Sequence, residues 1–119
     1  MTAEEIRNNL AQFTGSEEYH RLSLGKLYFT DGCKYLAEAC QCYWLMDIIA
    51  SYQGKGLDGD TEGFQVWELT KTTGSEAIVI CKDGYDTTVR KQIIPYTDFP
   101  LNEIKLYCTN GVVLLPSEN

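Results

Sequence analysis

Residues 104–115, with the sequence IKLYCTNGVVLL, contain the strongest local signal in the chain, which is Asn110-Gly111 between two apolar runs. A two-residue type I′ turn needs positive φ at both central positions, and Asn-Gly adopts these angles readily. The stretch therefore predicts an antiparallel hairpin. Residues 112–115 are apolar at every position, which predicts a strand buried on both faces, or, at a sheet edge, the seam for a second subunit.

The residues before this hairpin alternate between apolar and polar side chains. Period-two alternation is typical of half-buried strands, and Gly, Asp and Pro favour turns between them. The alternating segments are residues 64–70, 76–81, 88–94 and 104–108. Together with residues 112–115 they predict a four- to five-stranded antiparallel meander that ends in the tight hairpin.

The first half of the chain has helical periodicity instead. Thr2 and Glu5 have the spacing of a capping box and predict a helix over residues 3–12. Asp31 is the expected N-cap of a second helix over residues 32–42, and residues 43–52 either form a third helix or continue a bent one.

Residues 16–31 have a weaker pattern that suggests extended structure near residues 25–30. Helices followed by strands predict an α+β fold, with the N-terminal helices packed on one face of the sheet. A length of 119 residues predicts one domain, 1–119, with a helical part over about 1–55 and a sheet part over about 63–116.

Charge and cysteine content limit the function classes. Seventeen acidic and ten basic residues give a net charge of −7, which disfavours direct binding to nucleic acid or to anionic membranes. Five cysteines, an odd number, fit free thiols in a reducing compartment. The first ten residues lack the pattern of a secretory signal, and the longest apolar run is too short to span a bilayer, so we expect a cytoplasmic location.

Asp58, Asp60 and Glu62 form the most suggestive metal-binding pattern. Oxygen donors at alternate positions followed by Gly63 resemble the opening of an EF-hand calcium loop. The twelfth position, which should be a bidentate glutamate, is Leu69. The favoured interpretation is therefore a solvated loop between helix and strand, and we expect no metal and no cofactor.

Cys33 is the main candidate for a catalytic nucleophile, because a thiol in the first turn of a helix can have a lowered pKa. The chain's single histidine, His20, would have to act as its base. The alternative is a core cysteine, as its helical spacing with Leu36 suggests. Cys40 and Cys42 lack the second ligand pair that a structural zinc site needs, so they too are expected to be buried thiols.

Several segments resemble a family of short uncharacterised bacterial proteins, frequent in cyanobacteria and on mobile elements, that is known as a domain of unknown function. The likeness spans nearly the whole chain and rests on Phe13-Thr14-Gly15, Thr30-Asp31-Gly32, Tyr35-Leu36-Ala37-Glu38, Tyr43-Trp44-Leu45, Ala50-Ser51-Tyr52-Gln53 and residues 110–118 (NGVVLLPSE). The resemblance implies no catalytic residues. It implies an accessory protein of plasmids, phages or variable genome regions.

The leading hypothesis is a small non-enzymatic, acidic accessory protein that binds another macromolecule, first of all a protein, and a homodimer stays open. Eight tyrosines and two tryptophans favour an interface, because these side chains supply rigid contact area with a polar tip. One alternative is a small enzyme that uses Cys33 or a carboxylate in a cleft between helices and sheet. Another is an acidic nucleic-acid mimic that blocks a nucleic-acid-binding protein.

Overall fold

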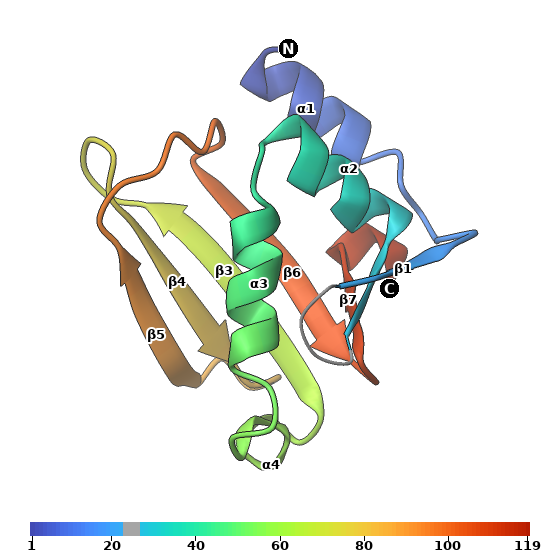
Figure 1. Cartoon of the computed structure of the whole chain (residues 1–119), viewed down its shortest axis with the longest axis vertical. Helices are drawn as coiled ribbons and strands as arrows, with labels where there is room; N and C mark the ends of the chain where they lie inside the picture. Colours follow the sequence, from blue (N-terminus) through green and yellow to red (C-terminus); the bar gives the residue numbers. More distant parts are fainter. Residues whose placement is uncertain (23–26) are drawn as a thin grey trace.

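Figure 1 shows a twisted sheet with helices packed against it. The computed structural model describes residues 1–22 and 27–119, and within them the sheet has seven strands. The helices are α1 (Ala3–Leu10), α2 (Asp31–Ala39), α3 (Tyr43–Ser51), α4 (Leu57–Thr61) and the 3-10 helix η1 (Pro116–Glu118). The strands are β1 (Tyr19–Arg21), β2 (Tyr28–Thr30), β3 (Phe64–Lys71), β4 (Ala77–Lys82), β5 (Thr88–Ile94), β6 (Glu103–Thr109) and β7 (Val112–Leu114).

The N-termini of α1 and α2 are fixed by side-chain caps. At α1 the Thr2 hydroxyl accepts a hydrogen bond from the Glu5 amide (3.1 Å), and the Glu5 carboxylate accepts one from the Thr2 amide (3.3 Å), so the capping box is formed. At α2 the cap is Thr30, whose hydroxyl accepts a hydrogen bond from the Cys33 amide at 3.3 Å. The expected cap, Asp31, is instead the first helical residue.

Helices α2 and α3 are separate elements, because the chain turns at Gln41, where φ is +51°. The residues expected to form a solvated loop after α3 contain the short helix α4. Its first residue, Leu57, is fully buried, and the Thr61 hydroxyl donates a hydrogen bond to the Leu57 carbonyl at 2.7 Å. These contacts hold one helical turn in a sequence whose Gly and Asp residues favour turns.

The strand order is β1-β2-β7-β6-β3-β4-β5. The prediction of a purely antiparallel meander of four to five strands was wrong in three respects, namely the pairing order, the direction of one strand pair and the number of strands. Strand β6 pairs with β3 rather than with β5, and β2 runs parallel to β7. The short strands β1 and β2 add two members from the first third of the chain, outside the expected sheet part.

The closing hairpin is formed as predicted. Asn110 and Gly111 have φ of +52° and +76°, and Thr109 pairs with Val112 across the turn. Strand β7 lies inside the sheet, between β6 and β2, and Val113 is fully buried. The edges are instead β1 and β5.

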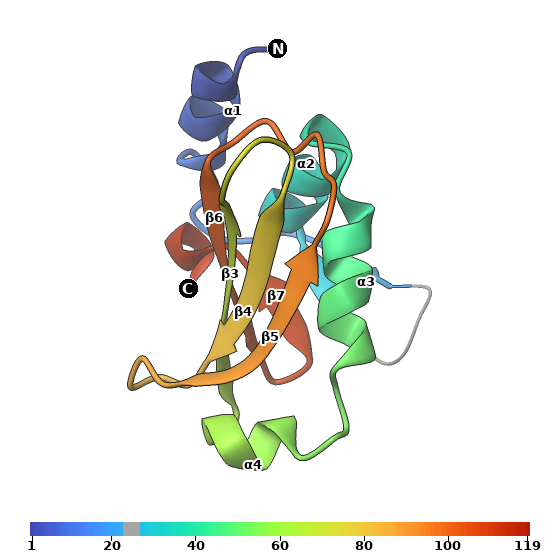
Figure 2. The same cartoon turned by 90° about the vertical axis from the view of Figure 1, so that its left-hand side faces the viewer.

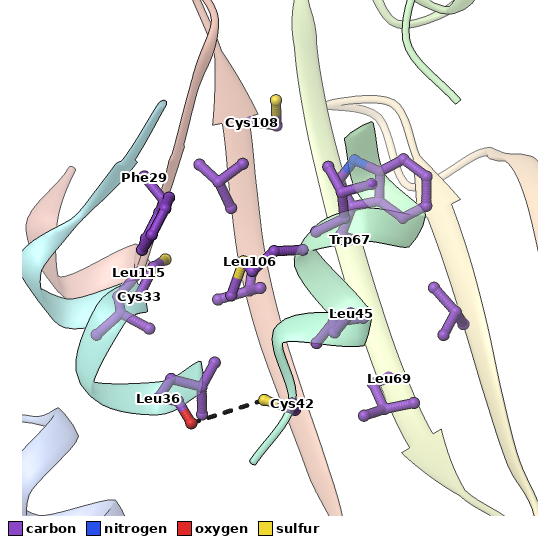
Figure 3. Packing of buried hydrophobic residues seen from close by; sticks show 14 of the residues in the cluster. Phe29, Cys33, Leu36, Cys42, Leu45, Trp67, Leu69, Leu106, Cys108 and Leu115 are labelled. Atoms are coloured by element: carbon purple, nitrogen blue, oxygen red, sulfur yellow. Dashed lines mark hydrogen bonds between the residues drawn. The ribbon is translucent and has the colours of Figure 1, made fainter. Parts of the chain in front are cut away.

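The two faces of the sheet differ in how they are covered. Figure 2 shows α2 and α3 on one side, whereas α1 and η1 lie toward the other. Buried side chains such as Trp67, Leu69 and Leu106 point into the layer beneath α2 and α3, where they pack near Leu45 and Cys42 (Figure 3). Because strand residues alternate between faces, the residues between them point to the opposite side. This opposite side is called the open face below.

Extended structure is found at β2, which agrees with part of the expectation for residues 25–30. Residues 25 and 26 lie outside the described part of the chain, as does Leu24. No helix in the described ranges is both long and apolar enough to cross a bilayer.

Candidate functional site

Cys33 lies at the N-terminal turn of α2, as the sequence indicated, but its side chain points into the core (Figure 3). The side chain is fully buried, and desolvation raises the pKa of the thiol from 9.0 to about 12. At neutral pH the group is therefore the protonated thiol, which is a poor nucleophile. Burial outweighs the hydrogen bonds with Thr30, which by themselves would lower the pKa of Cys33.

His20 is directed to a different partner. Its Nε2 lies 2.9 Å from Oδ1 of Asp31, and its ring centre lies 5.4 Å from that of Phe29, with the two ring planes tilted by 41°. Asp31 also accepts hydrogen bonds from the amides of Glu17 (3.2 Å) and Glu18 (3.4 Å) through Oδ2. The bond from His20 and these amides hold the pKa of the Asp31 carboxyl below its ordinary value, against a smaller opposing effect of desolvation.

Glu18 completes a group of three potential metal ligands with His20 and Asp31. One ligand atom from each residue lies within 4.8 Å of the other two. The sequence reasoning missed this group, although Glu18 and His20 have the i, i+2 spacing that places strand residues on one face. Asp31 joins them only because β1 pairs with β2, and α2 begins directly after β2.

The acidic residues of the expected loop lie on or beside α4, and Asp58 and Asp60 contact other side chains. The Asp60 carboxylate forms an ion pair with Arg90 at 3.0 Å, and Asp58 Oδ1 accepts a hydrogen bond from Gln65 at 3.3 Å. Glu62 follows the helix with φ of +54°. The segment is thus a helical turn rather than a loop that wraps its oxygens around a cation.

The remaining thiols are also buried. Cys40 and Cys42 flank the turn between α2 and α3, so they do not share a helix. Their interaction lowers the pKa of Cys40 and raises that of Cys42, and desolvation raises the pKa of both Cys81 and Cys108 to about 12. The expectation that these cysteines are buried thiols of the core therefore agrees with their positions.

The open face presents an apolar patch that sequence reasoning did not identify. The strand register aligns Ile78 with Ile93 and Ile80 with Lys91. Ile93 is 55% exposed, and Ile78 and Ile80 are partly exposed. The patch crosses β4 and β5 and has Lys91 at its outer edge. The alternation of β4 and β5 places these isoleucines on one face of the sheet, but the sequence did not show which face the helices would leave uncovered.

A groove lies on the same face, beside this patch. Its volume is about 590 Å³. It is lined by α1, by η1 and by residues of β3 and β6, including Arg7, Leu10, Glu68, Lys105 and Pro116. Glu68 lies between Lys82 (3.4 Å) and Lys105 (3.8 Å), so the floor carries paired charges beside apolar walls.

Residues 4–119 match a family model described as "Family of unknown function (DUF6876)". The chain belongs to this family. The match covers nearly the whole sequence, as the resemblance indicated, and it assigns no activity, host or partner. Bacterial origin and association with mobile elements stay predictions. No curated protein and no solved structure matches the chain.

Proposed function

We propose that the protein acts by binding another protein through the open face of its sheet. The observation that carries this proposal is the apolar patch of Ile78, Ile80 and Ile93, which spans two adjacent strands. None of the helices in residues 1–22 and 27–119 lies above it. An isolated exposed isoleucine is ordinary, whereas neighbouring ones on adjacent strands provide continuous area for a partner.

Charge indicates the chemistry of the partner. The chain as a whole has a net charge of −7, yet three lysines, Lys82, Lys91 and Lys105, lie on the open face among the half-buried apolar residues. Glu68 and Asp86 pair with two of them. Lys91 lies beside Ile80 and is exposed. An apolar surface that carries a carboxylate opposite Lys91 would complement this arrangement.

The thiol-enzyme alternative receives less support, because Cys33 is buried with a raised pKa. The nucleic-acid-mimic alternative also receives less support from the open face, since three of its charges are positive. A binding role needs no catalytic group and uses the part of the sheet that the chain's own helices leave free.

The test replaces residues on the patch and at a matched exposed position elsewhere. A photo-reactive amino acid at position 93 should cross-link a partner in the native host, and the purified partner is then titrated against variants. Ile93→Glu and Lys91→Glu should each weaken binding by about tenfold or more, since central apolar contacts and charge reversals have effects of this size. Tyr43→Ser, on α3 and also exposed (42%), is the control and should leave affinity unchanged.

Equal affinity of both open-face variants and the wild type would refute the proposal. A cross-link to a second copy of the chain, with a mass twice that of the monomer in sedimentation, would also refute it, because the surface would then be a homodimer interface. Circular dichroism and unfolding midpoints of the variants must match the wild type for either conclusion.

A further inference from the structure

Glu18, His20 and Asp31 come together where strand β1 meets the start of α2. Glu18 immediately precedes β1, and His20 is the middle residue of that strand. The antiparallel register pairs Tyr19 with Thr30, so Asp31, the first residue of α2, comes next to Glu18. The three side chains are close because of backbone pairing, and their approach needs no long flexible loop.

The Asp31 carboxylate is held in place by the backbone. Its Oδ2 accepts hydrogen bonds from the amides of Glu17 (3.2 Å) and Glu18 (3.4 Å), and its own amide donates to Ser16 Oγ at 3.0 Å. These contacts leave Oδ1 directed at His20. Partners of this kind orient the direct ligands in metal sites and are a common feature of them.

The His20 ring is also fixed in orientation. It packs at a tilt against Phe29, which is itself 5% exposed, and its Nε2 lies 2.9 Å from Oδ1 of Asp31. Two donor atoms bound to one ion at about 2.0–2.2 Å lie roughly 3 Å apart. The observed separation therefore matches that of two ligands of one ion, and a carboxylate oxygen of Glu18 lies within 4.8 Å of a ligand atom of each residue.

We propose that Glu18, His20 and Asp31 bind a divalent transition-metal ion such as Zn²⁺ or Co²⁺. One imidazole nitrogen and two carboxylate oxygens form a donor set that suits ions of intermediate hardness. Three protein ligands leave at least one position for water or an anion. The two carboxylates supply the negative charge that balances the ion.

The competing explanation is a contact that only joins β1 to α2. In that case the His20–Asp31 bond is complete by itself, and Glu18, which is exposed, adds nothing to it. The two explanations therefore differ in the role of Glu18. Removing its charge should reduce metal affinity if the three residues form a site, and should change nothing if they form a tether.

The experiment follows the imidazole signals of His20 by NMR during titration with Zn²⁺. The chain has one histidine, so these signals need no further assignment. We expect both ring nitrogens to shift and to saturate at one equivalent of metal. Glu18→Gln should weaken the affinity by about tenfold or more, by analogy with the loss of other groups that support a metal. Glu17→Gln removes a neighbouring exposed carboxylate and should bind as the wild type does.

A second measurement separates this site from the five thiols. Co²⁺ bound by nitrogen and oxygen gives weak visible bands, whereas thiolate ligands add an intense charge-transfer band in the near ultraviolet. We expect only the weak bands, and in His20→Gln the spectrum should be that of hydrated Co²⁺ alone. Unchanged His20 signals at millimolar metal, equal affinity of Glu18→Gln and the wild type, or a thiolate band would each overturn the proposal.

Discussion

Replacing Gly32 by alanine tests how η1 is attached to α2. Gly32 lies in the first turn of α2, and a Cβ there would lie 2.6 Å from Leu115 Cδ1 and 2.7 Å from Glu118 Oε1. Both atoms end flexible side chains, so they would move rather than clash. The Glu118 carboxylate cannot move without breaking contacts, because it accepts hydrogen bonds from Thr30 Oγ1 (2.5 Å), the Gly32 amide (3.2 Å) and the Leu115 amide (3.0 Å).

The expected magnitude follows from opposing effects. Alanine is favoured over glycine by about 1 kcal/mol inside a helix. Losing charge-assisted hydrogen bonds from Glu118 costs about 1.5–3 kcal/mol, and losing its charge from the helix N-terminus costs about 0.3–1 kcal/mol. The free energy of unfolding of Gly32→Ala should therefore fall by about 1–3 kcal/mol, measured by urea denaturation with the slope unchanged.

The matched control is Gly59→Ala in α4, where a Cβ would meet nothing within 4 Å. This variant should be as stable as the wild type or more stable by up to about 1 kcal/mol. In a Glu118→Ala background, Gly32→Ala should lose most of its destabilising effect. If Gly32→Ala is as stable as Gly59→Ala in the wild-type background, the proposed displacement of the Glu118 carboxylate is refuted.

Two further predictions concern buried polar groups and thiols. Gln65→Met should lower the free energy of unfolding by about 2–4 kcal/mol. Gln65 is 2% exposed, and its Oε1 accepts hydrogen bonds from Trp67 Nε1 and Gln53 Nε2, both at 2.9 Å. A loss under 1 kcal/mol in urea denaturation would contradict this prediction. In the folded protein the pKa of Cys33 is raised to about 12, whereas in the unfolded chain it lies near 9. The buried, protonated thiol therefore contributes fully to stability below pH 9, and this contribution is lost as the pH rises from 9 toward 12. The free energy of unfolding should thus fall above pH 9, by up to about 1.4 kcal/mol per pH unit for each such thiol, and Cys33→Ala should reduce this slope. An unchanged slope would count against the burial of Cys33.

The parts of the fold that were predictable depend on contacts local in the chain. The Thr2–Glu5 cap and the Asn110-Gly111 turn each involve residues a few positions apart, and both are formed. The position of the α2 cap was predicted one residue late, because Thr30 and Asp31 are both good capping residues and only the tertiary structure distinguishes them. At Thr30 the hydroxyl also reaches Glu118.

Strand pairing could not be inferred from the same patterns. Three-residue strands such as β1 are too short for alternation to be recognised, and alternation does not specify a partner strand. The group around His20 depends on this pairing, so it was not predictable once β1 had been missed. Cys33 shows the reverse situation: its position in α2 was predicted, but its environment was not, since burial of the thiol depends on how α2 packs on the sheet.

The parallel pairing of β2 with β7 affects how this chain can fold. Thr30 and Glu118 are 88 positions apart, and Tyr28 pairs with Val112 across a similar separation. Closing so large a loop costs conformational entropy before the contacts it enables can form. On the ribosome, β1 and β2 would wait for β7 to leave the exit tunnel, while the antiparallel strands β3 to β5 could already pair. We therefore expect the region around α2 to be the last to acquire native protection, and the first to open when residues 112–118 are loosened.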